Sequence, residues 1–342
     1  MEGTRMIGAK AMVTGGAGFI GSELVRQLAA TDCQVLVVDN LVNGRRENLE
    51  GSAPELVELE VADIRDQERM RRLLCGVDVV FHLACLGVRH SIHSPLENHE
   101  VNATGTLSLL IAAREAGVKR FVYVSSSEVY GTARTVPMTE EHPTSPTTVY
   151  GSSKLAGECY ARAFWRTDGF PTAIVRPFNA YGPRCHHEGD SGEVIPKFLL
   201  RCMADLPMVV FGDGTQTRDF TFVSDTAAGI RLAGTVAAAV GQTINLGSGR
   251  EIRIDELAQQ VAAVAGRPTK VVRDNPRPGD VLRLYAGCAL ARDVLGFQPT
   301  VSLEDGLCRL RQWYLERGES PERLLESEVV HNWETHRSSA GG

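Results

Sequence analysis

Tyr150 and Lys154 have residue types and a spacing that could support acid–base chemistry. If the segment is helical, residues four positions apart share one face. A phenol, whose pKa is about 10, is a poor base at neutral pH, but a nearby ammonium and a cationic ring would stabilise the phenolate. The pair therefore predicts an acceptor for the proton of an alcohol whose carbon gives up a hydride. One hydroxyl of Ser125, Ser126 or Ser127 would hydrogen-bond the reacting oxygen.

A glycine-rich turn near the N-terminus predicts a dinucleotide site. Residues 16–21 read Gly-x-Gly-x-x-Gly between an apolar strand, 11–14, and a segment with helical apolar spacing. Missing side chains let the backbone approach a pyrophosphate, and the helix N-terminus supplies free N–H groups. Asp39 ends a second strand, 34–38, where an acid accepts hydrogen bonds from ribose hydroxyls and repels a 2′-phosphate. The pattern therefore favours NAD over NADP.

Strands and helices alternate along the first half of the chain, which indicates an α/β fold with a doubly wound parallel sheet. Strands are predicted at 11–14, 34–38, 56–59, 77–83 and 121–124, with helices that include 67–74 and 95–116. Ligands of such sheets bind at the carboxyl ends of the strands. The segments that follow strand ends should therefore meet at one crevice; they are residues 15–21, Asp39, Asp63, residues 83–87 and residues 125–128.

Two polar residues at strand ends have competing interpretations. Asp63 could accept a hydrogen bond from an adenine amino group, with Ile64 packing against the ring, or it could cap the helix 67–74. His82 ends an apolar strand, and we expect it to be a buried, hydrogen-bonded histidine rather than a catalyst.

Composition excludes several classes of protein. The 342 residues carry a net charge of −6 with both signs interspersed, which argues against a nucleic-acid partner. The eight cysteines show no C-x-x-C pair and no Cys/His metal spacing, so we predict reduced thiols in a cytoplasmic protein and no metal site. The sequence has no apolar run of about 18 residues and no signal-peptide pattern at its start, so we predict no membrane partner.

From about Lys10 to about Trp313, the chain resembles the extended short-chain dehydrogenase/reductases, in their NAD-dependent nucleotide-sugar epimerase/dehydratase branch. The motifs occur in the family's order: TGGAGFIG (14–21), Asp39-Asn40, DIRD (63–66), HLA (82–84), SSSEVYG (125–131), Tyr150-x-x-x-Lys154, RPFNAYGPR (176–184), GDGTQTRDF (212–220), NLGSG (245–249) and RPGD (277–280).

The resemblance implies a Rossmann-type NAD-binding domain (8–177, with returning segments near 220–248), a smaller nucleotide-sugar-binding domain (178–219 and 249–318) and a C-terminal tail (319–342). The implied NAD contacts are Gly15, Gly18, Phe19, Ile20, Asp39, Asn40, Asn43, Gly44, Asp63, Ile64, Leu83, Ala84, Cys85, Asn102, Ser125, Tyr150, Lys154 and Pro177. It also suggests a homodimer built from helical stretches near 107–116 and 158–165.

For the substrate, the resemblance implies a UDP-sugar. Asn179 and Arg218 would contact the diphosphate and Arg277 a phosphate or ribose, whereas Val194, Val210 and Phe211 would flank the uracil. The remaining implied contacts are Gly87, Arg89, Ser127, Arg184, Lys197, Gln216 and Asp280.

The type of reaction is decided by the step after oxidation at C4 of the sugar. Family 4,6-dehydratases carry an Asp-Glu pair where this chain has Ser127-Glu128, so dehydration is disfavoured, and Ser126, Ser127 and Glu128 join Tyr150 and Lys154 as predicted catalytic residues. The Gly87-Val88-Arg89 loop resembles that of UDP-glucuronate 4-epimerases, and Arg184 could hold a sugar carboxylate.

We therefore expect 4-epimerisation of UDP-glucuronate and UDP-galacturonate. A UDP-glucuronate decarboxylase and a 4-epimerase of neutral UDP-glucose or UDP-N-acetylglucosamine remain open. An NAD-binding sensor or scaffold without catalysis is the non-enzymatic alternative.

Overall fold

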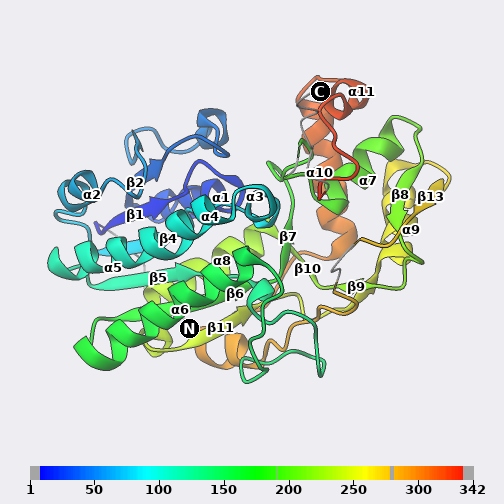
Figure 1. Ribbon diagram of the computed structural model, residues 1–342. Coiled ribbons are helices and arrows are strands. Elements are labelled where there is room, and N and C mark those ends of the chain that lie inside the picture. Colours follow the sequence, from blue (N-terminus) through cyan, green and yellow to red (C-terminus); the bar gives the residue numbers. More distant parts are fainter. Residues whose placement is uncertain (1–7, 190, 278–280, 334–342) are drawn as a thin grey trace, which may run out of the picture.

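The computed structural model describes residues 8–189, 191–277 and 281–333. Its larger part is built on a seven-stranded sheet in the order β11-β6-β5-β4-β1-β2-β3, in which every pairing is parallel (Figure 1). The strands are β1 (Lys10–Thr14), β2 (Gln34–Asp39), β3 (Val57–Val61), β4 (Val79–His82), β5 (Arg120–Val124), β6 (Thr172–Pro177) and β11 (Thr243–Leu246). The predicted doubly wound parallel sheet is confirmed.

Both faces of this sheet are buried, which explains why its strands read as continuous apolar runs. Ala11 and Val13 of β1 point into one core, whereas Met12 between them points into the other. The helices on the first face are α1 (Phe19–Ala29) and α8 (Val223–Thr235), and those on the second are α2 (Gln67–Leu73), α5 (Thr106–Glu115) and α6 (Val149–Asp168). The returning segment expected near 220–248 therefore supplies α8 and β11 to the larger part.

The helical stretch predicted at 95–116 contains a wider turn in its middle. It consists of α4 (Pro95–His99), a π-helical segment η2 (Glu100–Gly105) and α5. Asn102, in the π-helical segment, donates to the carbonyl of Leu86 at 2.9 Å and accepts from its N–H at 2.8 Å. The inward-facing amide in this wider turn holds the loop that follows β4, and π-helical turns are frequent at functional sites.

The smaller part packs around its own apolar core, on the right in Figure 1. Its helices are α7 (Val194–Met203), α9 (Ile254–Ala265), α10 (Leu303–Glu316) and α11 (Pro321–Leu325). Short strand pairs complete it and join it to the larger part: β7 (Asn179–Tyr181) with β10 (Phe220–Phe222), β8 (Met208–Phe211) with β13 (Val271–Asp274), and β9 (Thr217–Arg218) with β12 (Ile252–Arg253).

Short helical elements complete the structure: α3 (Val88–His93), η1 (Arg46–Leu49), η3 (Ser127–Val129), η4 (Ala237–Ala239) and η5 (Ala291–Leu295). The sequence predicted only a tail after residue 318, but its described part contains α11, which packs against α7. Within the described ranges, no helix combines the length and the apolar character that crossing a membrane requires.

A buried ion pair ties α6 to the middle of the sheet. Arg176 on β6 is 2% exposed, and its guanidinium donates to both carboxylate oxygens of Glu158 on α6, at 2.8 and 2.7 Å. Ser125, directly after β5, donates to the same carboxylate at 2.6 Å, and Tyr130 accepts from Arg176 at 2.8 Å. Because these groups satisfy one another away from water, they fix the helix relative to two strands.

We expect that breaking this pair destabilises the protein far more than breaking a surface pair. Arg176→Met leaves the buried Glu158 carboxylate with only the partly exposed Arg162, 3.3 Å away, as its cation, at a cost of about 3–5 kcal/mol in the free energy of unfolding. The double variant Arg176→Met with Glu158→Leu should lose much less. Denaturant unfolding measures both.

The matched control is Arg292→Ala, because Arg292 pairs with Asp293 where both side chains are more than half exposed. Its cost should lie within about 1 kcal/mol. Equal losses for Arg176→Met and Arg292→Ala would contradict the role assigned to the buried pair.

Candidate active site

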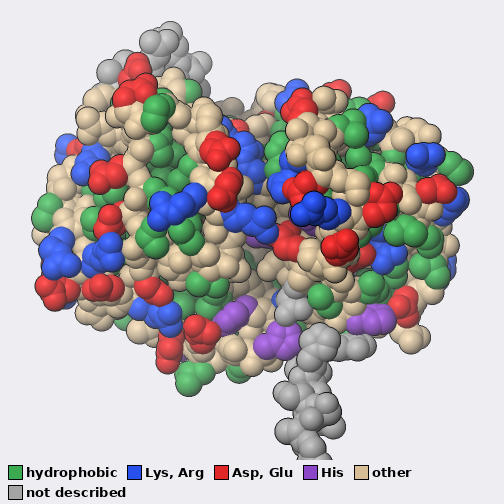
Figure 2. Space-filling model, turned by 90° about the horizontal axis from the view of Figure 1, so that it is seen from above, with side chains coloured by type: hydrophobic (Ala, Val, Ile, Leu, Met, Phe, Trp, Pro, Cys, Tyr) green, Lys and Arg blue, Asp and Glu red, His purple; other side chains and the backbone are tan. Residues whose placement is uncertain are grey.

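One large cavity lies at the carboxyl ends of the parallel strands and extends to the smaller part. Its volume is about 1080 Å³, and its lining comes from both parts of the molecule. This volume is at the upper end of the range of about 300–1,000 Å³ that ligand pockets usually span. Figure 2 shows the surface hollowed between the two halves, with basic and acidic side chains around the opening. The segments that follow the strand ends meet at this cavity, as the sequence predicted.

The turn between β1 and α1 approaches the loop after β4 so closely that side chains are excluded. Gly15 has a φ of +71°, and a Cβ on it would lie 2.7 Å from the backbone nitrogen of Ala84. A Cβ on Gly21 would meet the carbonyl oxygen of Gly15. The turn therefore presents bare backbone at the N-terminus of α1, which is the cradle that a pyrophosphate needs.

Asp39 lies beside this cradle with its carboxylate held by backbone donors. Its oxygens accept from the N–H of Ala17 at 3.0 Å and of Leu41 at 2.9 Å, and the residue is 7% exposed. Burial raises the pKa of the Asp39 carboxyl, while these two hydrogen bonds oppose the rise. A carboxylate fixed at the end of β2 and lining the cavity fits the ribose of a dinucleotide.

Asp63 also lines the cavity, and the alternative role considered for it is wrong. The residue that caps α2 is Asp66, which accepts from the N–H of Arg69 at 3.0 Å. Asp63 instead pairs with Arg65 at 2.7 Å and accepts from Asn40 at 3.4 Å. The Arg65 side chain lowers the pKa of the Asp63 carboxyl, which keeps an anionic acceptor at the predicted adenine position.

Together these features fit NAD, and the structure brings almost all of its predicted contacts to the cavity wall. Those that line it are Gly15, Gly18, Phe19, Ile20, Asp39, Asn40, Asn43, Gly44, Asp63, Ile64, Leu83, Ala84, Cys85, Ser125, Tyr150, Lys154 and Pro177. Asn102 is the exception, because its amide is turned inward to Leu86, which itself lines the cavity. Asn102 therefore acts on the site by holding this loop.

The predicted catalytic tyrosine lies in the first turn of α6, packed against the serine run. Thr148 caps the helix, and a Cβ on Gly151 would lie 2.7 Å from the carbonyl oxygen of Glu128. Tyr150 lines the cavity next to Ser126, whose hydrogen bond to the phenol favours its ionised form. The missing side chain at Gly151 is what lets the helix start this close to the strand end.

Electrostatics around Tyr150 oppose its ionisation. Burial raises the pKa of the phenol well above its usual value, Cys85, Glu128 and Glu193 raise it further, and the Ser126 hydrogen bond only partly offsets them. The net shift is upward, whereas the predicted lowering requires a cationic nicotinamide ring beside the phenol in addition to Lys154. In this state of the site the phenol is a proton donor at neutral pH.

The position of Lys154 explains in part why the pKa of Tyr150 is raised and not lowered. Its ammonium is buried, donates to the carbonyl oxygen of Val124 at 2.7 Å and lies 5.2 Å from the centre of the Tyr123 ring. It is thus directed to the end of β5, one helical turn from Tyr150. His82 is a buried structural histidine, as expected: its two ring nitrogens contact the hydroxyls of Thr14 and Thr106 at 2.7 and 2.9 Å.

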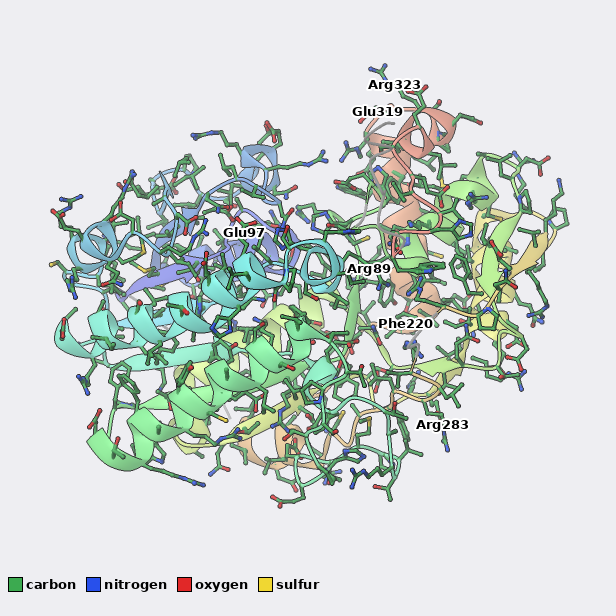
Figure 3. All side chains as sticks on the ribbon, viewed as in Figure 1. Arg89, Glu97, Phe220, Arg283, Glu319 and Arg323 are labelled. Carbon is green, nitrogen blue, oxygen red and sulfur yellow. The ribbon has the colours of Figure 1, made fainter. Side chains whose placement is uncertain are left out.

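The substrate side of the cavity also collects most of the residues predicted for it. Those that line it are Gly87, Arg89, Ser127, Asn179, Val194, Lys197, Phe211, Gln216, Arg218 and Arg277. Arg89, in the first turn of α3, lies between the two parts of the molecule (Figure 3). Arg218 donates to the carbonyl oxygens of Thr217 and Val281, each at 2.7 Å, which fixes its guanidinium at the cavity edge.

Three predicted substrate contacts are not brought to this wall. Arg184 is half-buried elsewhere, and burial together with the nearby Arg26 lowers its pKa to about 10, an effect that Glu23 partly offsets. Val210 points into the core of the smaller part because neighbouring residues of a strand face opposite sides, so Val209 lines the cavity instead. Asp280 lies outside the described residues.

The sequence did not reveal two features of the cavity. Glu193, just before α7, lines it near Tyr150, and the surrounding protein raises the pKa of its carboxyl to about 7. The side chain still faces the open cavity and is solvent-exposed, so water screens part of this effect. The second feature is the segment after α11, which supplies Glu328, Val330 and Trp333. Neither lies in a motif, so no sequence signal pointed to them.

All eight cysteines are free thiols. Among the residues that the structure describes, no group of three or more His, Cys, Asp or Glu side chains could hold a metal ion.

Comparison with known proteins places these observations in a family. Residues 11–247 match the model of the NAD dependent epimerase/dehydratase family. The UDP-glucose 4-epimerase of Mycolicibacterium smegmatis is 37% identical over 310 residues, which cover 89% of this chain and 98% of that enzyme.

Two solved structures show the same architecture at similar identity. The epimerase of Methanothermobacter thermautotrophicus superposes with a TM-score of 0.87 at 36% identity, over 93% of this chain and 95% of that one. The UDP-glucose 4-epimerase of Thermotoga maritima, solved with UDP-glucose, gives 0.85 at 32% identity, over 91% and 100%.

The glycine cradle generates a test of the dinucleotide site. We expect Gly15→Ala to weaken NAD binding at least tenfold, because the new Cβ meets the backbone of Ala84 and pushes the turn away from the loop after β4. Tryptophan-to-NADH energy transfer or the NAD content of the purified protein measures this loss.

Gly51→Ala is the matched control, since Gly51 has a φ of +77° with nothing within 4 Å of an added Cβ. Both variants carry backbone strain of about 1 kcal/mol, but only Gly15→Ala should lose NAD. Equal NAD affinity in the two variants would contradict the assigned cradle.

Proposed function

Because the chain belongs to the NAD-dependent epimerase/dehydratase family and is a nucleotide-sugar epimerase that uses NAD, we propose that it inverts C4 of a UDP-hexose. The observation that carries this proposal is that Tyr150 and Ser126 line the same cavity as the dinucleotide cradle and as Arg218, a predicted diphosphate contact. A sugar carbinol held between Tyr150 and the dinucleotide cradle would have an acid–base group on one side and a redox cofactor on the other.

The proton steps belong to Tyr150. Its phenol takes the proton of the sugar 4-hydroxyl and returns it after the carbon has been inverted. NAD held at the Gly15 turn and Asp39 would supply the acceptor for the hydride of C4 and its return, so the reaction would leave no net redox change. In the neutral form that burial favours, the Tyr150 phenol can donate its proton to the sugar oxygen. To accept the proton of the 4-hydroxyl, the phenol must ionise, and this requires a nearby cation. We assign this role to Lys154, on the next turn of α6.

Inversion requires a 4-keto sugar to present its other face while its nucleotide stays bound. The cationic side chains of Lys197, Arg218 and Arg277 line the cavity and suit a diphosphate. With the diphosphate anchored, the sugar can turn about its link to it. Elimination of a 6-hydroxyl is not expected, because Ser127 stands where the related dehydratases carry an aspartic acid.

For the sugar, the site supports a neutral hexose better than the hexuronate that the sequence suggested. Glu128 and Glu193 both act electrostatically on Tyr150, and both line the cavity. A hexuronate carboxylate is attached beside C4 and would therefore come close to these two acids. Arg184, the predicted partner of that carboxylate, does not line the cavity. We therefore favour UDP-glucose and UDP-galactose as the substrate pair.

A UDP-hexuronate remains a second candidate because of Arg89. This arginine lines the cavity, and its charge contributes to lowering the pKa of Lys197. A guanidinium at the rim of the sugar site could pair with a carboxylate. In that case UDP-glucuronate would give UDP-galacturonate, or a UDP-pentose if the 4-keto acid lost carbon dioxide.

We expect Tyr150→Phe to reduce turnover of UDP-glucose by about 10²–10⁴-fold, because it removes the acid–base group. NAD binding should persist, since the phenol is one contact among many. Coupled detection of UDP-galactose measures the rate. Tyr160→Phe, on the same helix and outside the cavity lining, is the control and should leave the rate unchanged. Retained turnover in Tyr150→Phe would refute the assignment.

The choice of sugar is tested at Glu193. The wild-type protein should convert UDP-glucose with a higher kcat/KM than UDP-glucuronate. Glu193→Gln should narrow this preference several-fold, because removing a charge near the sugar relieves a repulsion of about 1 kcal/mol. Chromatography of the UDP-sugar products measures both reactions.

Glu304→Gln, on the exposed face of α10, is the charge-matched control and should leave the preference as it is. Faster conversion of UDP-glucuronate than of UDP-glucose by the wild-type protein would overturn the neutral-hexose assignment, and the product would distinguish epimerisation from decarboxylation.

A further inference from the structure

After α11 the chain does not leave the molecule but returns to the cavity. We call residues 327–333 the C-terminal strap. This segment lies outside residues 11–247, which the family model matches. It begins where the carbonyl oxygen of Ser327 accepts from the N–H of Gly189 at 2.8 Å, in the loop that leads to α7. The strap therefore packs against a loop that also carries Glu193.

Side chains of α7 hold the strap along its first half. Arg201 donates to both carboxylate oxygens of Glu328 at 3.0 Å, and the two side chains are 15% and 8% exposed. Lys197 donates to the carbonyl oxygen of Val329 at 2.7 Å. A paired and largely buried arginine, together with a directed ammonium, makes this a fixed contact and not a loose tail.

The second half of the strap is held by β13 and by the loop before α7. His331 contacts the carboxylate of Asp274, the last residue of β13, at 2.8 Å. Asn332 donates to the carbonyl oxygen of Gly192 at 3.2 Å. The strap thus bridges α7, the loop before it and β13, and it closes one side of the substrate end of the cavity.

Its last described residue forms an aromatic corner with a predicted uracil contact. The rings of Trp333 and Phe211 meet edge to face, with centroids 4.7 Å apart at 88°. The guanidinium of Arg277 lies 5.1 Å from the Trp333 ring centre and 5.3 Å from that of Phe211. All three residues line the cavity. A planar base could pack on this corner while its phosphates meet the cations.

The cations around the strap describe the other half of such a ligand. Burial and the neighbouring charges of Arg277, Arg89 and Arg201, against the opposing effect of Glu328, lower the pKa of Lys197 to about 8. An ammonium crowded by other cations is stabilised when an anion binds among them. Aromatic rings next to such a cluster have the chemistry of a nucleoside diphosphate site.

We propose that the C-terminal strap is a wall of the nucleoside diphosphate subsite and that Trp333 contacts the bound nucleotide. The inference rests on the proposed function for the identity of the ligand, a UDP-sugar. Trp333 holds the base directly and keeps Arg277 between two rings. The strap accordingly sets the affinity for the nucleotide and leaves the sugar chemistry at Tyr150 to other residues.

The test uses UDP alone, so it does not depend on turnover. Trp333→Ala should raise the dissociation constant for UDP, measured by calorimetry, about tenfold, which is typical of losing an aromatic platform for a base. Trp333→Phe should recover most of the affinity, and NAD affinity should stay unchanged in both. Trp165→Ala, on α6 and outside the cavity lining, is the matched control and should bind UDP as the wild type does.

A fluorescence measurement covers the case in which Trp333→Ala does not fold. The sequence has three tryptophans, so Trp165→Phe with Trp313→Phe leaves Trp333 as the single emitter. Titration with UDP should then change its emission with the dissociation constant found by calorimetry. Unchanged emission, or unchanged UDP affinity in a folded Trp333→Ala, would overturn the proposal.

These outcomes are separable from those of the proposed function. A protein whose UDP affinity depends on Trp333, but which converts no UDP-hexose, would support the strap and refute the 4-epimerase. A protein that epimerises UDP-glucose with equal UDP affinity in the wild type and Trp333→Ala would do the reverse.

Discussion

The ion pair between Arg176 and Glu158 is the interaction on which the geometry of the site depends. It joins β6 to α6 inside the protein, and Ser125 adds the end of β5 to the same carboxylate. Because α6 carries Tyr150 and β5 leads into the serine run, the pair sets where the phenol stands relative to the serine hydroxyls. A buried pair with all its hydrogen bonds made tolerates little displacement, so the chemistry rests on a rigid base.

Close backbone contacts extend this rigidity to both ligands. Gly15 brings the dinucleotide turn against the loop after β4, and Gly151 brings the first turn of α6 against Glu128. At both positions a side chain would occupy the space that the neighbouring backbone takes. Asn102 holds the loop after β4 through two hydrogen bonds to the backbone of Leu86. The cofactor cradle and the acid–base group are thus placed by contacts between segments far apart in sequence.

Charge is distributed unevenly along the cavity, and this divides its work. Glu128 and Glu193 stand near Tyr150 and disfavour negative charge on its phenol. Lys197 and Arg277 belong to a cluster of cations that also includes Arg89 and Arg201, and Arg277 lies against the aromatic corner of Phe211 and Trp333. A ligand with a diphosphate at one end and a neutral sugar at the other matches this arrangement. The C-terminal strap belongs to the cationic end, where it pairs with Arg201 and directs Lys197.

The sequence by itself determined the parallel sheet, the dinucleotide turn with Asp39, and the pairing of Tyr150 with Lys154 on one helix, because each is a local pattern of spacing and residue type. It did not reveal that burial by distant residues raises the pKa of Tyr150, or that the Lys154 ammonium is directed to the carbonyl oxygen of Val124. The positions of Arg184 and Glu193 were likewise decided by the tertiary structure: one arginine of a motif turns toward α1, while an acid outside any motif reaches the cavity. The strap was beyond prediction for the same reason, because its partners are brought to it only when the chain has folded.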